Sequence, residues 1–399
     1  MRYRAIQKIL GTLLGLFSFT LVPPLLISWW TRDGATDAFA IGAAAIAIAG
    51  FALAVPVRNT REDLKLRDGF IVVVLFWVVL GCSGAIPLIL AESLRMPIVD
   101  AMFESISGLT TTGATVITGL DDLPASVLFY RQLLQWLGGM GIIVLAVAVL
   151  PMLGIGGMQL YRAETPGPVK DTRLTPRITE TAKALWYIYL TMTVSCTLAY
   201  FAAGMSWFDA ICHSFSTVAI GGFSTHDASI GYFHNATIEA ICVVFMFLAA
   251  INFSLHFVAW KKRSVSPYVE DTEFKAYAGL LSVVCISCVI GLSVSGYMED
   301  AGEAIRSAVF HAISIGTTTG FATTTYQDWP RSLPVMLLFA SFVGGCAGST
   351  GGGLKVVRIV LLYKQGLREV RRLIHPNAVM SIKMAGRPVP YRVVDAVWG

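Results

Sequence analysis

The hydrophobic residues of this 399-residue chain gather in eight long blocks that are separated by shorter polar stretches. A helix needs about 20 residues to cross the hydrocarbon core of a bilayer, and most of the blocks reach that length. The pattern therefore predicts an all-α integral membrane protein. The blocks span residues 9–30, 38–57, 69–91, 127–153, 184–203, 237–260, 277–294 and 333–341, the last continuing to 362.

Three segments between these blocks repeat one another. AMFESISGLTTTGAT (101–115), AICHSFSTVAIGGFS (210–224) and AVFHAISIGTTTGFA (308–322) align without gaps on Gly113, Gly222 and Gly320. Each segment opens with enough residues for a short helix and continues into a stretch rich in Thr or Gly that favours no helix. Such a helix is too short to span the bilayer, so we expect it to re-enter and its loop to line a protein-walled path.

The aligned glycines indicate what these loops bind. A dehydrated cation such as K⁺ needs a ring of oxygens, and backbone carbonyls supply it when successive residues turn them inward. That backbone requires positive φ at some positions, which glycine adopts at little cost. The second segment lacks the threonines of the other two, so the shared chemistry is expected to come from carbonyls rather than from side chains.

Composition and charge agree with a membrane protein. Apolar residues make up 55% of the chain and charged residues only 14%, whereas soluble domains carry about 25% charged residues. Most of the 30 Lys and Arg residues lie at the N-terminus and in 56–68, 161–183, 261–275 and 355–387. The positive-inside rule places these stretches, and therefore the N-terminus, in the cytoplasm. The opposite loops are acidic, with Asp121, Asp209 and Asp227 among them, and together they would attract cations.

Five stretches of the chain resemble a known family. TTTGATVITGLDDLP, FSTVAIGGFSTHDASIGYF, GGCAGSTGGGLKVVRI, GGMGIIVLAVAVLPMLGIGGMQLYRAE and PGPVKDTRLTPRI are similar to the TrkH-type subunit of bacterial K⁺ uptake systems, within the Trk, Ktr and HKT superfamily. The resemblance implies two N-terminal helices followed by helix, pore-helix and helix units arranged pseudo-symmetrically around a central pore. It also implies a multi-pass protein of the bacterial inner membrane, a homodimer in the lipid bilayer, and a cytosolic nucleotide-binding regulatory subunit.

The resemblance divides the chain and assigns its ion site. It implies two N-terminal transmembrane helices in 1–60, pore repeats in 61–160, 161–263 and 264–375, and the truncated start of a fourth repeat in 376–399. K⁺, the transported ion, would be coordinated without any covalent cofactor by the backbone carbonyls of a selectivity filter. The filter residues would be Thr111, Thr112, Gly113, Ile220, Gly221, Gly222, Thr318, Thr319 and Gly320.

The resemblance also implies a flexible intramembrane gate loop at 344–353 that interrupts the last inner helix just below the filter. Its glycine content favours no helix, because each glycine costs about 1 kcal/mol relative to alanine. The gate residues would be Gly344, Gly345, Gly348, Ser349, Thr350, Gly351, Gly352 and Gly353, followed by the positive charge of Lys355.

The expected function is thus K⁺ uptake through a selective, gated pore, with no enzymatic activity and no nucleic-acid partner. The alternative is a secondary cation/H⁺ symporter, because broken helices and repeats also occur in such transporters. The stretch GSTGGGLK differs from a nucleotide-binding GxxxxGK[ST] motif, because Leu354 precedes Lys355 and Val356 follows it.

Several polar residues in or near apolar segments are open to two interpretations. Glu104, His213 and His311 share one repeat position and are either a metal or proton-relay site or pore-helix ends that meet water, which is the simpler explanation. Arg131 is expected to be an interfacial anchor that extends toward water. The glycines at 138–141 predict close helix packing, with a hinge as the alternative. The basic run 368–375 fits anionic lipid, the regulatory subunit or a plain positive-inside signal.

Overall fold

The structure, a computed structural model, describes residues 3–60, 66–144, 178–298, 300–330, 332–375, 380–384 and 387–389, together with 394 and 397. Nearly all of the elements in these ranges are helices, which confirms the all-α membrane fold. They are α1 (Tyr3–Phe19), α2 (Val22–Thr31), α3 (Thr36–Ala54), η1 (Val55–Val57), α4 (Leu66–Leu90), α5 (Ile98–Leu109), η2 (Leu120–Asp122), α6 (Ala125–Val144), α9 (Ile178–Ala202), α10 (Trp207–Ala219), η5 (Ser229–Phe233), α11 (Ala236–Ala249), α12 (Phe253–Lys262), α13 (Ser266–Glu270), α14 (Thr272–Ser295), α15 (Ala301–Gly316), η6 (Tyr326–Asp328), α16 (Leu333–Val343) and α17 (Val356–Ile374), with the paired strands β1 (Lys383–Met384) and β2 (Arg387–Pro388).

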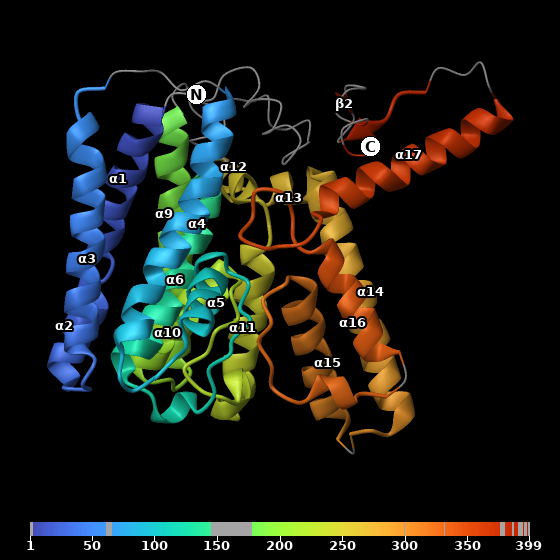
Figure 1. The fold of residues 1–399 in the computed structure, drawn as a ribbon. Helices are drawn as coiled ribbons and strands as arrows, with labels where there is room; N and C mark the ends of the chain where they lie inside the picture. The colour runs from blue at the N-terminus through green and yellow to red at the C-terminus, as the bar shows by residue number, and fades with distance from the viewer. Residues whose placement is uncertain are drawn as a thin grey trace.

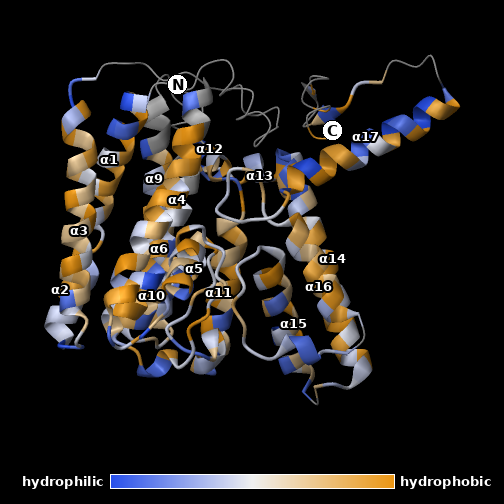
Figure 2. Cartoon of the chain, viewed as in Figure 1, coloured by the Kyte–Doolittle hydropathy of each residue, from blue (hydrophilic) through white to orange (hydrophobic). Residues whose placement is uncertain are grey.

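The long helices run roughly parallel to one another (Figure 1). Within the described residues, five helical spans are long and apolar enough to cross a membrane, or six if one bent pair counts as a span. Their surfaces are mostly hydrophobic, as Figure 2 shows. The predicted block 127–153 is described only as far as residue 144, where α6 ends. The spans are Tyr3–Thr31, Thr36–Val57, Ile71–Leu90, Lys183–Ala202 and Thr272–Ser295, with Ala236–Ala249 and Phe253–Lys262 as the bent pair.

Three short helices, α5, α10 and α15, lie among the long ones, in the half of the molecule away from the N-terminus (Figure 1). Each packs against the helices that precede and follow it in the chain. The Ser206 and Asp300 side chains begin α10 and α15 by accepting hydrogen bonds from backbone N–H groups of the first turn. The helices stop at three loops that we name loop 1 (110–115), loop 2 (219–224) and loop 3 (317–322). The short helices predicted from the repeat are therefore present.

The hydrophobic block 237–260 is not one straight span, in contrast to the prediction of a full apolar helix. It forms α11 and α12, which are bent by 94° at a short break. Asn252 begins α12 by accepting a hydrogen bond from Ser254 N, and Phe253 N donates to Gly348 O. Cys346 N also donates to Ala250 O. The backbone groups that lose their helical partners at the break therefore find new partners in a glycine-rich segment, residues 344–355, which lies about a hundred positions later in the chain.

That glycine-rich segment separates α16 from α17. The chain leaves the helix at Gly344 (φ 70°) and re-enters one at Val356, so the predicted interruption is present. We name residues 344–355 the glycine-rich loop. Beyond it, α17 extends away from the bundle (Figure 1) and alternates hydrophilic and hydrophobic residues along its length (Figure 2).

The two N-terminal helices α1 and α3 touch through glycines. A Cβ added to Gly11 would lie 2.6 Å from Ala54 N and 2.8 Å from Gly50 O, and one added to Gly50 would lie 2.6 Å from Gly15 N. Small residues let helix backbones approach this closely in membranes. A Cβ added to Gly15 itself would meet nothing within 4 Å.

Gly11→Ala is therefore expected to destabilise the protein by about 1–3 kcal/mol through overpacking. Gly15→Ala, one turn further along the same helix, serves as the matched control and is expected to be neutral or slightly stabilising. The measurement is the apparent melting temperature of the detergent-purified protein, with the loss of folded protein on heating monitored by size-exclusion chromatography. Equal melting temperatures for the two variants would contradict the close packing of α1 on α3.

Candidate functional site

The three loops share one unusual backbone. Thr111, Ile220 and Thr318 have φ of 57°, 55° and 72°, and they occupy one repeat position. Two residues later, the aligned glycines Gly113, Gly222 and Gly320 have φ of 76°, 81° and 88°. A non-glycine residue rarely takes a positive φ, and for a β-branched residue such a value is an outlier. Six left-handed residues at two equivalent positions therefore define a common loop shape.

The same backbone hydrogen bond begins each loop. The middle residues Thr112, Gly221 and Thr319 donate their N–H groups to the carbonyls of Ser107, Ser216 and Ser314 at 2.9, 2.9 and 2.8 Å. In loops 1 and 3 the serine hydroxyl also donates to a carbonyl just after the glycine, Ser107 to Ala114 at 2.6 Å and Ser314 to Phe321 at 2.7 Å. Each short helix thus fixes the start of its own loop.

Neighbouring loops lie directly against one another. A Cβ added to Gly113 would lie 1.9 Å from Gly221 O, and one added to Gly222 would lie 2.0 Å from Thr319 O. A Cβ added to Gly320 would meet no described atom within 4 Å. Loops 1 and 3 also line one cavity of about 430 Å³. The cavity is lined by Thr112, Gly113, Ala114, Ile315, Thr318, Thr319, Gly320, Tyr326, Pro334, Leu338 and Ser341.

One side chain from each short helix braces the far end of its loop. The Glu104 carboxylate accepts from Thr115 Oγ1 at 3.0 Å and from Val116 N at 3.2 Å. His213 and His311 each place Nδ1 2.9 Å from the carbonyl four residues earlier. His213 Nε2 lies 2.9 Å from Ser224 Oγ. His311 Nε2 lies 3.2 Å from Thr324 O and 3.4 Å from Thr323 N.

All three of these side chains are fully buried. The sequence interpretation of Glu104, His213 and His311 as helix ends that meet water is therefore wrong, because each faces its own loop. Among the residues that the structure describes, no group of three or more His, Cys, Asp or Glu could hold a metal ion. Their shared position reflects a shared structural task, which is to hold the loop in shape.

Arg131 of α6 corrects a second expectation. It is not an interfacial anchor, because its side chain is only 1% exposed and pairs with Glu104 at 2.7 Å. It also donates to Thr115 Oγ1 at 3.0 Å and to Ser224 O at 3.2 Å, and its guanidinium lies 4.3 Å from the centre of the Phe223 ring. One buried guanidinium thus connects loop 1 to loop 2 through hydrogen bonds to both.

The predicted close packing of the glycines at 138–141 is confirmed on the same helix. A Cβ added to Gly138 would lie 1.9 Å from Leu109 O, and one added to Gly139 would lie 3.0 Å from Ala219. These glycines bring α6 against the ends of α5 and α10, where loops 1 and 2 begin.

The segments that follow loops 1 and 2 are joined by hydrogen bonds between polar residues. Asp227 accepts from Gly119 N at 3.1 Å and Leu120 N at 3.0 Å, while Asp121 lies 2.5 Å from His226 Nδ1. Burial lowers the pKa of His226, but hydrogen bonds to Asp209 and Asp121 outweigh it and raise the pKa above 6.5. Asp121 and Asp227 are therefore engaged in contacts between the segments that follow loops 1 and 2, in addition to any attraction they exert on cations. Asp209 instead contacts Thr225 and His226 of its own repeat.

The glycine-rich loop lies against loops 2 and 3. Gly352 N donates to Thr318 Oγ1 at 2.7 Å, and Thr350 Oγ1 donates to Val218 O at 3.0 Å and Ala249 O at 3.3 Å. The Lys355 ammonium donates to Gly351 O. From the opposite side, the buried carboxylate of Glu273 accepts from Ala347 N at 2.6 Å. The predicted flexible loop is held in place by hydrogen bonds to four other segments.

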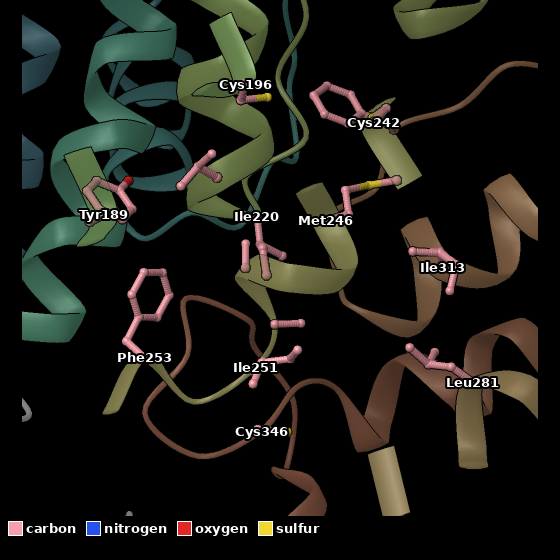
Figure 3. Close-up of a cluster of buried hydrophobic side chains, with 14 of the residues drawn as sticks. Tyr189, Cys196, Ile220, Cys242, Met246, Ile251, Phe253, Leu281, Ile313 and Cys346 are labelled. Carbon is pink, nitrogen blue, oxygen red and sulfur yellow. The ribbon is translucent and has the colours of Figure 1, made fainter. Parts of the chain in front are cut away.

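A buried apolar cluster joins the same parts. Ile220 of loop 2, Ile251 and Phe253 at the break between α11 and α12, and Cys346 of the glycine-rich loop belong to one cluster (Figure 3). The nine predicted filter residues and the glycine-rich loop therefore lie together in one region. Arg131, Gln135 and Glu273 also contact this region. The sequence interpretation named Arg131 for a different role and did not name Gln135 or Glu273.

The comparisons with known proteins agree with this arrangement. The family model described as TrkH, cation transport protein, matches residues 35–399. The chain belongs to the TrkH family of cation transport proteins. The Trk system potassium uptake protein TrkH of Halomonas elongata is 56% identical over 399 residues, which are 100% of this chain and 83% of that protein. Its namesake in Escherichia coli K12 is 54% identical with the same coverage.

A solved structure has the same fold. The crystal structure of the potassium transporter TrkH from Vibrio parahaemolyticus superposes with a TM-score of 0.92 at 52% identity, covering 100% of this chain and 82% of that one. The predicted family, the all-α membrane architecture and the assignment to transporters rather than enzymes are thereby confirmed. As a TrkH-family chain, this is a cation transport protein with several membrane-spanning helices.

The Arg131 contacts generate a stability prediction. Arg131→Met leaves the Glu104 carboxylate buried without its cation, which is expected to destabilise the protein by about 3–5 kcal/mol. The double variant Arg131→Met/Glu104→Gln removes both charges and should recover part of the loss. The readout is the apparent melting temperature in detergent. Arg306→Met is the comparison, because Arg306 is 43% exposed in its pair with Glu239, so its loss should cost less than the loss of the fully buried Arg131.

Proposed function

We propose that this chain takes up K⁺ across the bacterial inner membrane through a selective pore bounded by loops 1, 2 and 3. The observation that carries the proposal is the repeated left-handed backbone at Thr111, Ile220 and Thr318 and at the glycine two residues beyond each. Related proteins that share more than half of the sequence are named potassium uptake proteins, which supports K⁺ as the ion.

In this proposal, backbone carbonyls of the nine predicted filter residues replace the hydration shell of the ion. Alternation of left-handed and ordinary residues lets consecutive carbonyls face a common side, which a regular strand does not allow. The carboxyl ends of α5, α10 and α15 lead directly into the loops, and their partial negative charge favours a cation. Glycine at position 113 leaves room for the neighbouring Gly221 carbonyl, which a side chain would displace.

The glycine-rich loop is proposed as the gate. Its contacts with Thr318 of loop 3 and with Val218, just before loop 2, support this role. Glycine and serine fill most of it, so its backbone has alternative conformations once its hydrogen bonds break. Lys355, the last residue of this loop, adds a positive charge that would repel a cation in the path.

The remaining parts of the proposal concern topology and partners. The distribution of Lys and Arg places the N-terminus in the cytoplasm. The resemblance to Trk systems supports a homodimer and a cytosolic nucleotide-binding regulatory subunit that acts on the gate. The domain division given by the repeats, with a fourth repeat beginning in 376–399, belongs to the same proposal.

The test is rubidium tracer uptake into liposomes that contain the full-length protein. K⁺ should compete strongly with the tracer and Na⁺ only weakly. Gly113→Ser forces a side chain onto Gly221 O at a backbone of φ 76°, and it should lower the preference for K⁺ over Na⁺ by about tenfold, equivalent to about 1.4 kcal/mol.

Gly279→Ala in α14 is the control for this experiment, because an added Cβ there meets nothing within 4 Å and the preference should be unchanged. An unaltered ion preference in Gly113→Ser would refute the filter. Uptake with a fixed H⁺ stoichiometry would instead favour the cation/H⁺ symporter.

The gate has its own test. Thr350→Val keeps the side-chain shape but removes the hydroxyl that donates to Val218 O and Ala249 O. Loss of this hydrogen bond, which is shared between two carbonyls and contributes about 1 kcal/mol, should raise uptake in the absence of a regulatory subunit by roughly fivefold. Ion preference should stay constant, and Thr350→Ser, which retains the hydroxyl, should behave like the parent protein. Unchanged or reduced uptake in Thr350→Val would count against the gate.

A further inference from the structure

Loop 2 lacks an internal support that loops 1 and 3 possess. In loop 1 the hydroxyls of Thr110 and Thr112 are 2.8 Å apart, and in loop 3 the equivalent hydroxyls of Thr317 and Thr319 are also 2.8 Å apart. These hydrogen bonds link the first and third residues of the loop. The equivalent residues of loop 2 are Ala219 and Gly221, which have no hydroxyl.

Gln135 of α6 supplies polar contacts to loop 2 from a different repeat. Its Nε2 donates to Gly221 O at 2.7 Å, and its Oε1 accepts from Phe223 N at 3.2 Å. The side chain is fully buried, so water does not compete for these atoms. An amide that both donates to and accepts from one backbone segment fixes the separation of the two backbone groups it joins.

The identity of residue 221 matches this contact. A Cβ added to Gly221 would lie 2.3 Å from Gln135 Cδ and 2.4 Å from its Oε1. The threonines found at this position in loops 1 and 3 would therefore clash with Gln135. Glycine in the middle of loop 2 is needed for the approach of the Gln135 amide, as well as for any contact with an ion.

The contact also reaches loop 1. The Gly221 oxygen that accepts from Gln135 is the atom lying 1.9 Å from a Cβ added to Gly113. Gln135 therefore fixes an oxygen at the junction between the first two loops. Without the amide, this oxygen and the N–H group of Phe223 would lose their partners in a buried site, and the loop would shift to satisfy them.

We infer that Gln135 is a positioning residue that holds loop 2 in its ion-selecting shape and so sets the preference for K⁺ over Na⁺. The inference rests on the proposed filter function. It adds the residue that positions the coordinating oxygens of loop 2, Gly221 O in particular. Selection between two cations depends on the positions and number of the coordinating oxygens, so displacement of Gly221 O should weaken discrimination before it abolishes flux.

The test compares two buried glutamines on the same helix. Gln135→Met retains length and apolar bulk but has no amide. Gln132→Met is the matched control, because Gln132 is also fully buried while neither atom of its amide has a hydrogen-bond partner among the described residues. Rubidium tracer uptake by the full-length protein in liposomes is measured against K⁺ and Na⁺ as competitors. Gln135→Met should lower the preference for K⁺ about tenfold, and Gln132→Met should leave it unchanged.

A second readout separates ion selection from folding. The apparent melting temperature should rise more with K⁺ than with Na⁺ in the parent protein and in Gln132→Met, and this difference should shrink in Gln135→Met. Gln135→Leu provides a second amide-free variant. If both Gln135 variants fail to give monodisperse protein while Gln132→Met succeeds, Gln135 acts in folding and the inference is overturned.

Gly222→Ser distinguishes failure of the inference from failure of the filter itself. If it lowers the K⁺ preference while Gln135→Met does not, the filter stands and the role of Gln135 is refuted. An equal loss in Gln135→Met and Gln132→Met would assign the effect to the packing of α6 and would also overturn the inference. If Gly222→Ser leaves the preference unchanged, the proposed filter fails and the role of Gln135 fails with it.

Discussion

The left-handed backbone at three equivalent non-glycine residues is the constraint on which the rest of the site depends. Thr111, Ile220 and Thr318 adopt a conformation that costs roughly 1–3 kcal/mol at each residue, and it persists only where the surroundings fix it. Hydrogen bonds from loop N–H groups to the carbonyls of the preceding serines hold the start of each loop, and Glu104, His213 and His311 hold its end. The buried polar groups around the loops therefore have a common structural purpose, which is to maintain a backbone that would otherwise relax.

Equivalent loops reach this shape with different chemistry. Loops 1 and 3 use paired threonine hydroxyls, whereas loop 2 uses the amide of Gln135. Ile220, the β-branched residue at the strained position of loop 2, is 1% exposed and packs into the apolar cluster with Cys346 and Ile251 (Figure 3). Apolar burial thus helps to stabilise the left-handed backbone of loop 2, whereas hydrogen bonds between threonine hydroxyls stabilise that backbone in loops 1 and 3. Pseudo-symmetry is preserved in the backbone while the side chains around it have diverged.

The sequence predicted those features that depend on local pattern. Short helices follow from apolar stretches that end in Gly and Thr, and the interruption after Val343 follows from a run of glycines too dense for a helix. Glycine alignment located positive φ at Gly113, Gly222 and Gly320. The sequence interpretation missed the pair of Arg131 and Glu104. A signal for it was present, because each of two neighbouring apolar segments carries one charge, and a buried charge without a partner is costly.

Other features depended on which elements meet in space. The break between α11 and α12 follows from the docking of residues 346 and 348, nearly a hundred positions away, and the composition of 237–260 alone indicates a continuous span. Gln135 and Glu273 are unremarkable in sequence, since each acts on a backbone segment that is distant in the chain, 88 and 74 positions away. Comparison of the repeats with one another could have found one clue, because Gly221 departs from the threonine of both other copies.

Loops 2 and 3 pack against the glycine-rich loop, so the stability of each depends on the position of the other. Gly352 donates to the hydroxyl of Thr318, a left-handed residue of loop 3, and Thr350 donates to the last carbonyls of α10 and α11. Displacement of the glycine-rich loop must therefore break contacts with two filter repeats and uncover Ile220. Each such hydrogen bond contributes only about 1 kcal/mol, so a binding partner of ordinary affinity has enough free energy to move the loop. Because Thr318 and Ile220 hold strained conformations, the same movement would also loosen loops 2 and 3. In the proposed filter, ion selection with the glycine-rich loop displaced would then depend on supports that this loop does not touch, Gln135 and Arg131 among them.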